Sequence, residues 1–266
     1  MSMKKILLTL AVMAVVTVAT AQNLKINVTM PGTLSALVGD QYNVEKLVLS
    51  GTLNDNDLRF IRSLGNLKEV NLRKLKNTTL GDSAFYGMKS LEKAWLPKRL
   101  VVLGRSAFEG CVKLSAIEFP QQLQAVPEYM LKDCPSIDKL FIHNTHVRRI
   151  GKGAFMNSSL RLIGMPSELR TIESMAFANC SRLEVIRVPQ WVTEIGSLAF
   201  ANCRMLRSII VDTENPPICA LDAFKGLDKC TLNVHHPELY RDRMPWNKID
   251  LSYEEYNGSE LRTNKH

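Results

Sequence analysis

The chain has 266 residues, of which 45% are apolar and 23% charged, and its formal net charge is +8. This balance is ample for a packed core and excludes wholesale disorder. The 14 glycines and 11 prolines are ordinary amounts, which exclude collagen-like and proline-rich low-complexity chains.

Residues 1–21 have the three parts of a secretory signal peptide. Two lysines precede an apolar run from Ile6 to Val18, and small residues follow up to Ala21. The run is shorter than the roughly 20 apolar residues of a membrane span. We expect cleavage after Ala21, which leaves 32 basic against 26 acidic side chains. The sequence therefore predicts an exported chain without a membrane span, secreted or held at the cell surface or in the periplasm.

Residues 22–79 are expected to form an N-terminal cap and the first irregular repeats, because a solenoid needs terminal units that cover its core. A short helix is predicted over residues 57–63, where apolar residues fall on one face. Asp55 or Asn56 is expected to be its N-cap, since either side chain can accept hydrogen bonds from the first turn.

A six-residue phrase recurs through residues 80–234, the segment predicted to carry regular repeats. A typical copy, residues 195–200, reads Ile-Gly-Ser-Leu-Ala-Phe. The steps between the last positions of successive copies are 23, 23, 24, 22, 23 and 24 residues, and so constant a period is typical of stacked repeats. The last positions are Phe85, Phe108, Leu131, Phe155, Phe177, Phe200 and Phe224.

A second phrase, Leu-x-x-Ile-x-Val-Pro, follows the first in most repeats, as in residues 183–189. Its alternating apolar residues predict a short strand with one buried face, which the proline ends. A short apolar pair then precedes the next turn, as in residues 192–195. Such a unit cannot bury its apolar side alone, so we expect successive units to stack into a solenoid with parallel strands.

The two phrases together resemble the BspA-type leucine-rich repeat of bacterial surface proteins, and residues 178–203 are nearly a consensus copy. The resemblance implies an α/β-type, β-rich, right-handed solenoid, with short parallel strands in one sheet and a capping unit at each end. It also implies surface adhesion, or recognition of host or microbial proteins. Two copies depart from the pattern. Pro127 stands where the turn glycine belongs, and one residue is missing between Phe155 and Leu160.

The C-terminal region, residues 235–252, resembles the closing unit of the same family. Residues 237–240 and Trp246 are expected to form a helical and aromatic lid over the last repeat. Residues 253–266 are polar and are expected to form a frayed tail.

Four of the six cysteines keep the period of the repeat, each three residues after the Phe or Leu that ends the first phrase. This spacing predicts a ladder of buried free thiols that donate to neighbouring carbonyls, although cysteines on adjacent coils are also close enough to bridge. Cys219 and Cys230 are off this register, and for them a disulfide and free thiols remain equally open. The ladder consists of Cys111, Cys134, Cys180 and Cys203.

Nothing in the sequence indicates an enzyme, a metal site or a cofactor site. The chain has no C-x-x-C, H-E-x-x-H, G-x-S-x-G or Walker sequence. His143 and His146 flank the end of a predicted strand and not a helix face. We therefore expect no catalytic residue, no metal and no cofactor.

A group of basic residues lies in neighbouring repeats. We favour a solvated surface over an anion site here, because the mature chain carries only a small excess of charge. Nucleic acid is not expected as a partner, since no aromatic residues are interleaved with these positions. The group comprises Arg148, Arg149, Lys152, Arg161 and Arg170.

One residue of each strand, between two buried positions, is expected to point outward from the sheet. The resulting column contains large apolar side chains, which suit the anchors of a partner. The alternatives are a register slip that buries some of them, or ordinary scattered surface apolar residues. Read in chain order, the column is Val48, Asn71, Trp95, Glu118, Phe141, Gly164, Arg187, Ile210 and Asn233. The candidate partner-binding residues are Trp95, Glu118, Phe141, Arg187 and Ile210.

The sequence therefore favours an exported, non-enzymatic repeat protein that binds macromolecules on its sheet surface. We expect a monomer whose partner is an extracellular protein or glycoprotein. Two alternatives remain: a scaffolding component of the cell envelope without a diffusible ligand, and a glycan-binding module in which Trp95 is the stacking platform.

Overall fold

The computed structural model describes residues 22–40, 43–227 and 229–249. The predicted signal peptide, residues 1–21, and the predicted tail, residues 253–266, lie outside this part of the chain.

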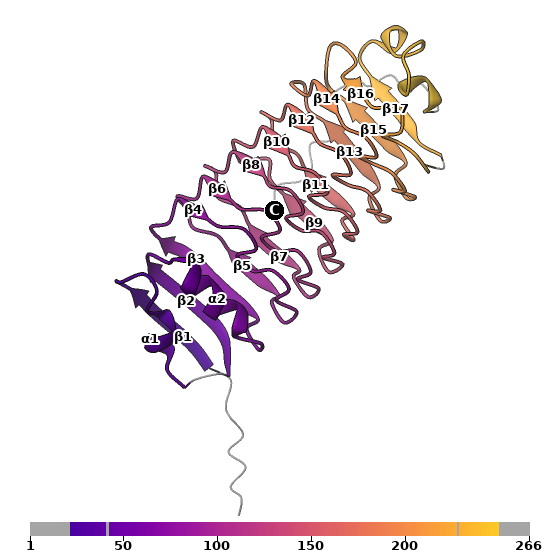
Figure 1. The fold of residues 1–266 in the computed structure, drawn as a ribbon. Coiled ribbons are helices and arrows are strands. Elements are labelled where there is room, and N and C mark those ends of the chain that lie inside the picture. Colours follow the sequence, from indigo (N-terminus) through magenta and orange to yellow (C-terminus); the bar gives the residue numbers. More distant parts are fainter. Residues whose placement is uncertain (1–21, 41–42, 228, 250–266) are drawn as a thin grey trace, which may run out of the picture.

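Parallel strands, one from each coil, form the main row of the structure, and the coils stack into a rod (Figure 1). The solenoid that the repeat predicts is confirmed. The ladder of this row is divided into three groups, β1-β2-β3-β5-β7, β9-β11 and β13-β15-β17. Its strands are β1 (Gln22–Val28), β2 (Val44–Gly51), β3 (Glu69–Leu75), β5 (Lys93–Trp95), β7 (Ala116–Glu118), β9 (Lys139–Phe141), β11 (Leu162–Gly164), β13 (Val185–Val188), β15 (Ser208–Val211) and β17 (Thr231–Val234).

A second row of two-residue strands runs along the rod beside the main row (Figure 1). The expectation of one sheet was therefore wrong, because the short apolar pair before each turn also forms parallel bridges between coils. The row is divided into β4-β6 and β8-β10-β12-β14-β16. Its strands are β4 (Thr79–Leu80), β6 (Val102–Leu103), β8 (Ala125–Val126), β10 (Arg149–Ile150), β12 (Thr171–Ile172), β14 (Glu194–Ile195) and β16 (Ile218–Cys219).

The repeated phenylalanines stack on one another inside the solenoid. Phe177 and Phe200 lie with ring centroids 5.2 Å apart and planes at 4°, and Phe85 and Phe108 form a similar pair at 4.9 Å. All four rings are fully buried. Leu131 is buried at the same repeat position but contributes no ring, so it divides the stack.

The predicted thiol ladder is confirmed, since all four of its members are free and buried. Each Sγ donates to the backbone carbonyl of the aromatic residue one coil earlier. Burial raises the pKa of the Cys111 and Cys180 thiols to about 12, because a thiolate would lose its hydration. Cys219 and Cys230 are also free thiols. The bonds are Cys111 to Phe85, 3.0 Å, and Cys134 to Phe108, Cys180 to Phe155 and Cys203 to Phe177, each 3.1 Å.

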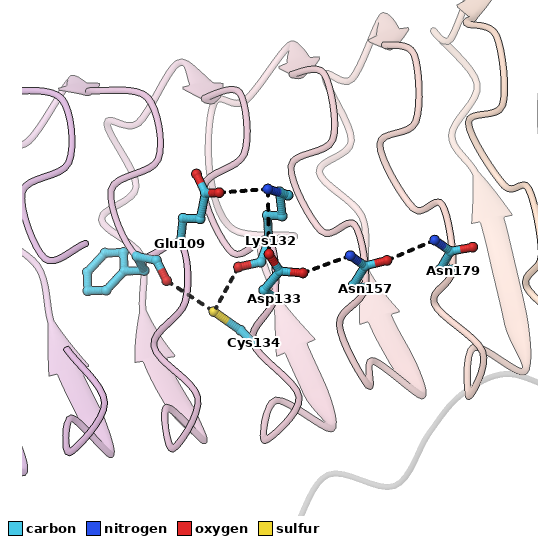
Figure 2. Close-up of polar contacts among 7 residues, drawn as sticks. Glu109, Lys132, Asp133, Cys134, Asn157 and Asn179 are labelled. Carbon is cyan, nitrogen blue, oxygen red and sulfur yellow. Dashed lines mark hydrogen bonds and ion pairs between the residues drawn. The ribbon is translucent and has the colours of Figure 1, made fainter. Parts of the chain in front are cut away.

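A second ladder runs along the turns that follow the aromatic stack (Figure 2). These turns contain two positions with a positive φ, and the one two residues after the repeated Phe or Leu holds only Gly, Asp or Asn, the residues that adopt this conformation most readily. The Asn157 amide donates to Asp133 at 2.7 Å, the Asn179 amide to Asn157 at 2.8 Å, and the Asn202 amide to Asn179 at 2.9 Å. The ladder therefore connects consecutive coils by side chains.

The N-terminal cap contains α1 (Leu34–Val38) and α2 (Asp55–Ser63). The predicted helix is present, but Asn54 is its N-cap, in place of Asp55 or Asn56, because its side chain reaches two backbone amides of the first turn. The buried Asp57 carboxylate accepts hydrogen bonds from the amides of Gly32, Leu34 and Asn54. One carboxylate thus attaches the segment before α1 to α2.

The last coil is covered by two short 3₁₀ helices, η1 (Pro237–Leu239) and η2 (Trp246–Lys248). Tyr240 and Trp246 are buried, and the Trp246 ring lies 5.1 Å from that of Phe224. This aromatic cover continues the phenylalanine stack. No helix in the described ranges is long and apolar enough to cross a membrane.

Candidate functional site

The strand face, the outward side of the main row, carries the residues that the repeat predicted to share a column. Strand pairing places most neighbours of this column in register, but Glu118 is not paired with Phe141, nor Gly164 with Arg187, because the main row is divided at these points. The residues paired are Val48 with Asn71, Asn71 with Trp95, Trp95 with Glu118, Phe141 with Gly164, Arg187 with Ile210, and Ile210 with Asn233.

Trp95 lies in a polar cluster that the sequence reading did not anticipate. The Arg73 guanidinium lies 5.6 Å from the centroid of the Trp95 ring, a cation–π arrangement. The same guanidinium pairs with the Glu118 carboxylate through two nitrogens. Arg73 on β3 and Glu118 on β7 therefore meet across Trp95 on β5. Arg73 is two residues after Asn71, so strand alternation could have identified it.

Phe141 is the most exposed aromatic residue of the predicted column, with 57% of its surface accessible. Gly164 lies beside it in register, and a Cβ at Gly164 would come within 3.2 Å of the ring. Leu162, on the same strand as Gly164, is 38% exposed. The imidazole of His143 contacts the Phe141 ring edge-on at 6.0 Å. We call Phe141, Leu162 and Gly164 the Phe141 patch.

Ile210 does not point into solvent as expected, since only 8% of its surface is accessible. Side chains from both neighbouring strands reach over β15 and explain this burial. Asn233 donates to the Ser208 hydroxyl at 2.9 Å, and Arg187 pairs with Asp212 at 2.6 Å. Ile210 lies between those two acceptors in the chain, so it is shielded. It is therefore not part of the exposed column.

The basic group in the middle of the rod is largely ion-paired. Arg148 lies 3.0 Å from Glu168, and Arg149 lies 2.7 Å from Glu173. His146 and Arg148 lower the pKa of Glu168 by hydrogen bonding to its carboxylate. These contacts neutralise much of the local charge, as expected of a solvated surface. Within the ranges that the structure describes, no cluster of three or more His, Cys, Asp or Glu residues could hold a metal ion.

Comparison with known proteins supports the repeat assignment. A family model described as a BspA type leucine-rich repeat region matches in six copies, over residues 58–181 and 140–231. No match was found among curated proteins.

Several solved structures are similar to this chain. A leucine-rich repeat protein of T. pallidum is 28% identical, with 53% of this chain and 57% of that chain covered and a TM-score of 0.37. A leucine-rich cell surface protein of Faecalibacterium prausnitzii is 20% identical, with 73% and 64% covered and a TM-score of 0.41. A leucine-rich repeat protein of Eubacterium ventriosum is 24% identical, with 67% and 58% covered and a TM-score of 0.46.

The chain matches about three fifths of the length of each of these proteins. The family model matches well over half of this chain. On that match, and on the repeat period and the parallel solenoid described above, the chain belongs to the BspA-type leucine-rich repeat family.

Proposed function

We propose that this protein is an exported, non-enzymatic binding module that takes up an extracellular protein on its strand face. The observation that carries the proposal is the exposed Phe141 ring beside Leu162, on a face whose other large apolar side chains, Trp95 and Ile210, are partly or wholly covered. Exposed aromatic residues on a rigid surface are frequent anchors of protein interfaces.

The neighbouring Arg73–Trp95–Glu118 cluster suits the same role. Its side chains hold one another in place, so binding would cost little additional side-chain entropy. Trp95 on β5 and Phe141 on β9 are two coils apart, which is about 10 Å where coils stack at the usual strand spacing. One protein segment can therefore contact both aromatic residues.

Glycan stacking on Trp95 is less well supported. Arg73 already lies over a face of the Trp95 ring, and a sugar would have to displace it there. The other alternative, a scaffold without a diffusible ligand, predicts that the strand face binds nothing in solution. Export depends on the signal peptide predicted in residues 1–21, and monomeric binding is the simplest arrangement for an open strand face.

The test is a pull-down of extracellular proteins with the mature chain, followed by affinity measurements on the captured protein. Trp95→Ala and Phe141→Ala should each weaken binding about thirtyfold, the usual loss at a central anchor. Melting temperatures should change little, because Phe141 is exposed and Trp95 is half-buried. The control is the double variant Arg148→Ala and Arg149→Ala, which lies outside the proposed site and should bind normally.

Two results would contradict the proposal. If only the double arginine variant lost binding, the basic group would be the site. If no extracellular protein bound the intact strand face, the scaffolding alternative would be favoured.

A further inference from the structure

A hollow near the C-terminal end of the rod is separate from the Phe141 patch. It lies between the turn at residues 190–193, the loop at residues 212–218, and His235 and His236. Two exposed apolar side chains contribute to its lining: Trp191, with 54% of its surface accessible, and Ile218, with 78%. The protein thus presents an indole to solvent within a recessed surface.

The backbone around this hollow is held from several sides. The Trp246 indole donates to the Pro217 carbonyl at 3.2 Å, and Thr213 bonds to the Tyr240 hydroxyl at 3.2 Å. The Ile218 amide donates to the Thr193 carbonyl at 2.9 Å, which joins the two sides. A site fixed in this way loses little conformational freedom when it binds a ligand.

Polar side chains also line the hollow. Gln190, Glu214 and Asn215 are exposed there, and these three side chains make no hydrogen bond or ion pair with any residue that the structure describes. They offer amide donors and both amide and carboxylate acceptors. Sugars present the complement, with hydroxyls that donate and accept around an apolar ring face. Asp212, held by Arg187, adds a second carboxylate at the edge.

The charge of the lining favours a neutral sugar over an acidic one. Its carboxylates are Asp212 and Glu214, and neither lysine nor arginine contributes to it. An acidic sugar would meet these two carboxylates with only the imidazoles of His235 and His236 as basic groups in the lining, although the whole chain is basic.

We propose that this hollow binds a neutral glycan, whose ring stacks on Trp191 while its hydroxyls bond to Gln190, Glu214 and Asn215. A protein partner is the less favoured ligand, because the centre of a protein interface is depleted in charged groups. The proposal does not depend on the strand face, which lies on other residues.

The test is an array of immobilised neutral oligosaccharides, with hexamers of glucose, mannose, xylose and N-acetylglucosamine. Sialyllactose and a heparin oligosaccharide supply the acidic comparison. The mature protein should bind at least one neutral hexamer and neither acidic probe. Trp191→Ala should weaken that binding about tenfold or more, and the double variant Gln190→Ala and Asn215→Ala should weaken it similarly. Trp191→Phe, which keeps an aromatic face, should stay within about threefold of the parent.

Trp95→Ala is the matched control, because it removes an indole from the strand face and should leave glycan binding intact. Loss of glycan binding by Trp95→Ala but not by Trp191→Ala would overturn the proposal. So would binding of acidic probes only, or of no probe at all. If Trp191→Ala weakened binding of the protein partner and no glycan bound, the hollow would be a protein-binding site. Failure of the strand face as a protein site, with glycan binding intact, would overturn only the proposed function.

Discussion

At the scale of single residues, the buried thiols make the stability of the fold decrease as the pH rises into the alkaline range. The pKa of Cys180 is raised by burial to about 12, from an ordinary value of 9.0. The thiol is neutral in both folded and unfolded chains below pH 9. As the pH rises from 9 towards 12, only the unfolded chain gains a thiolate, so folding stability is lost.

The corresponding prediction concerns Cys180→Ala, which removes one titrating thiol. The difference in the free energy of unfolding between the parent and this variant should fall by about 1.4 kcal/mol per pH unit above pH 9, because only the parent loses stability as the thiol ionises. Urea unfolding at pH 7, 9 and 10 measures the difference. Native protein should also resist alkylation at pH 8 until it is denatured. Rapid labelling of the native thiol, or a difference that does not change with pH, would contradict the buried ladder.

At the scale of elements, each coil is stabilised mainly by contact with its neighbours. Phe177 stacks on Phe155 at 5.1 Å and on Phe200 at 5.2 Å, so its ring joins three coils. Phe177→Ala should cost about 3–5 kcal/mol, as expected for a large buried ring. Hydrogen exchange should quicken chiefly between residues 150 and 205, since a repeat protein transmits damage to adjacent units. A uniform change along the rod would argue against independent coils.

The elements that follow the repeat period were predictable from sequence, and those that depend on side-chain reach were not. The aromatic stack, the thiol ladder and the strand column follow directly from a constant step. Asn54 was missed as an N-cap because the cap depends on local backbone geometry. Arg73 and the shielded Ile210 depend on side chains that reach across strands. The second row depends on hydrogen bonds between coils, which the apolar pairs alone do not specify.

At the scale of the whole molecule, the rod has a seam between two of its coils. The main row is interrupted between β7 and β9 and again between β11 and β13, the second row between β6 and β8, and the aromatic stack at Leu131. The break between β7 and β9 is the one that coincides with the break in the second row and with Leu131. Contacts on the turn side still cross the seam, including the amide of Phe108 to the carbonyl of Met130 at 2.9 Å. Glu109 and Lys132 also pair across it at 2.7 Å (Figure 2).

Pro127 gives a physical reason for the break in the second row. The residue at this repeat position donates its amide to the preceding coil in other repeats, as Gly104 does to Leu80 and Gly151 does to Val126, both at 2.8 Å. Proline has no amide hydrogen, so Pro127 cannot make this bond to the preceding coil. Pro127 departs from the repeat in the sequence, but the hydrogen bond that it lacks is made to the preceding coil, whose position the sequence alone does not give.

The seam predicts where the folded rod opens first. Amides of β7 and β9 should exchange faster than those of β15, which has a hydrogen-bonded neighbour on each side. Pro127→Gly restores a donor at a position where other repeats have glycine, so it should slow exchange across the seam. Glu173→Gly is the control at the same repeat position: its amide already donates to Ile150 at 2.9 Å and its carboxylate pairs with Arg149, so the variant gains no donor and should not slow exchange. If both variants changed exchange equally, or if β15 opened before β7 and β9, the missing amide of Pro127 would not be the weak point. The slowed exchange should be confined to the coils on both sides of Pro127, because stability in a solenoid is the sum of local interfaces.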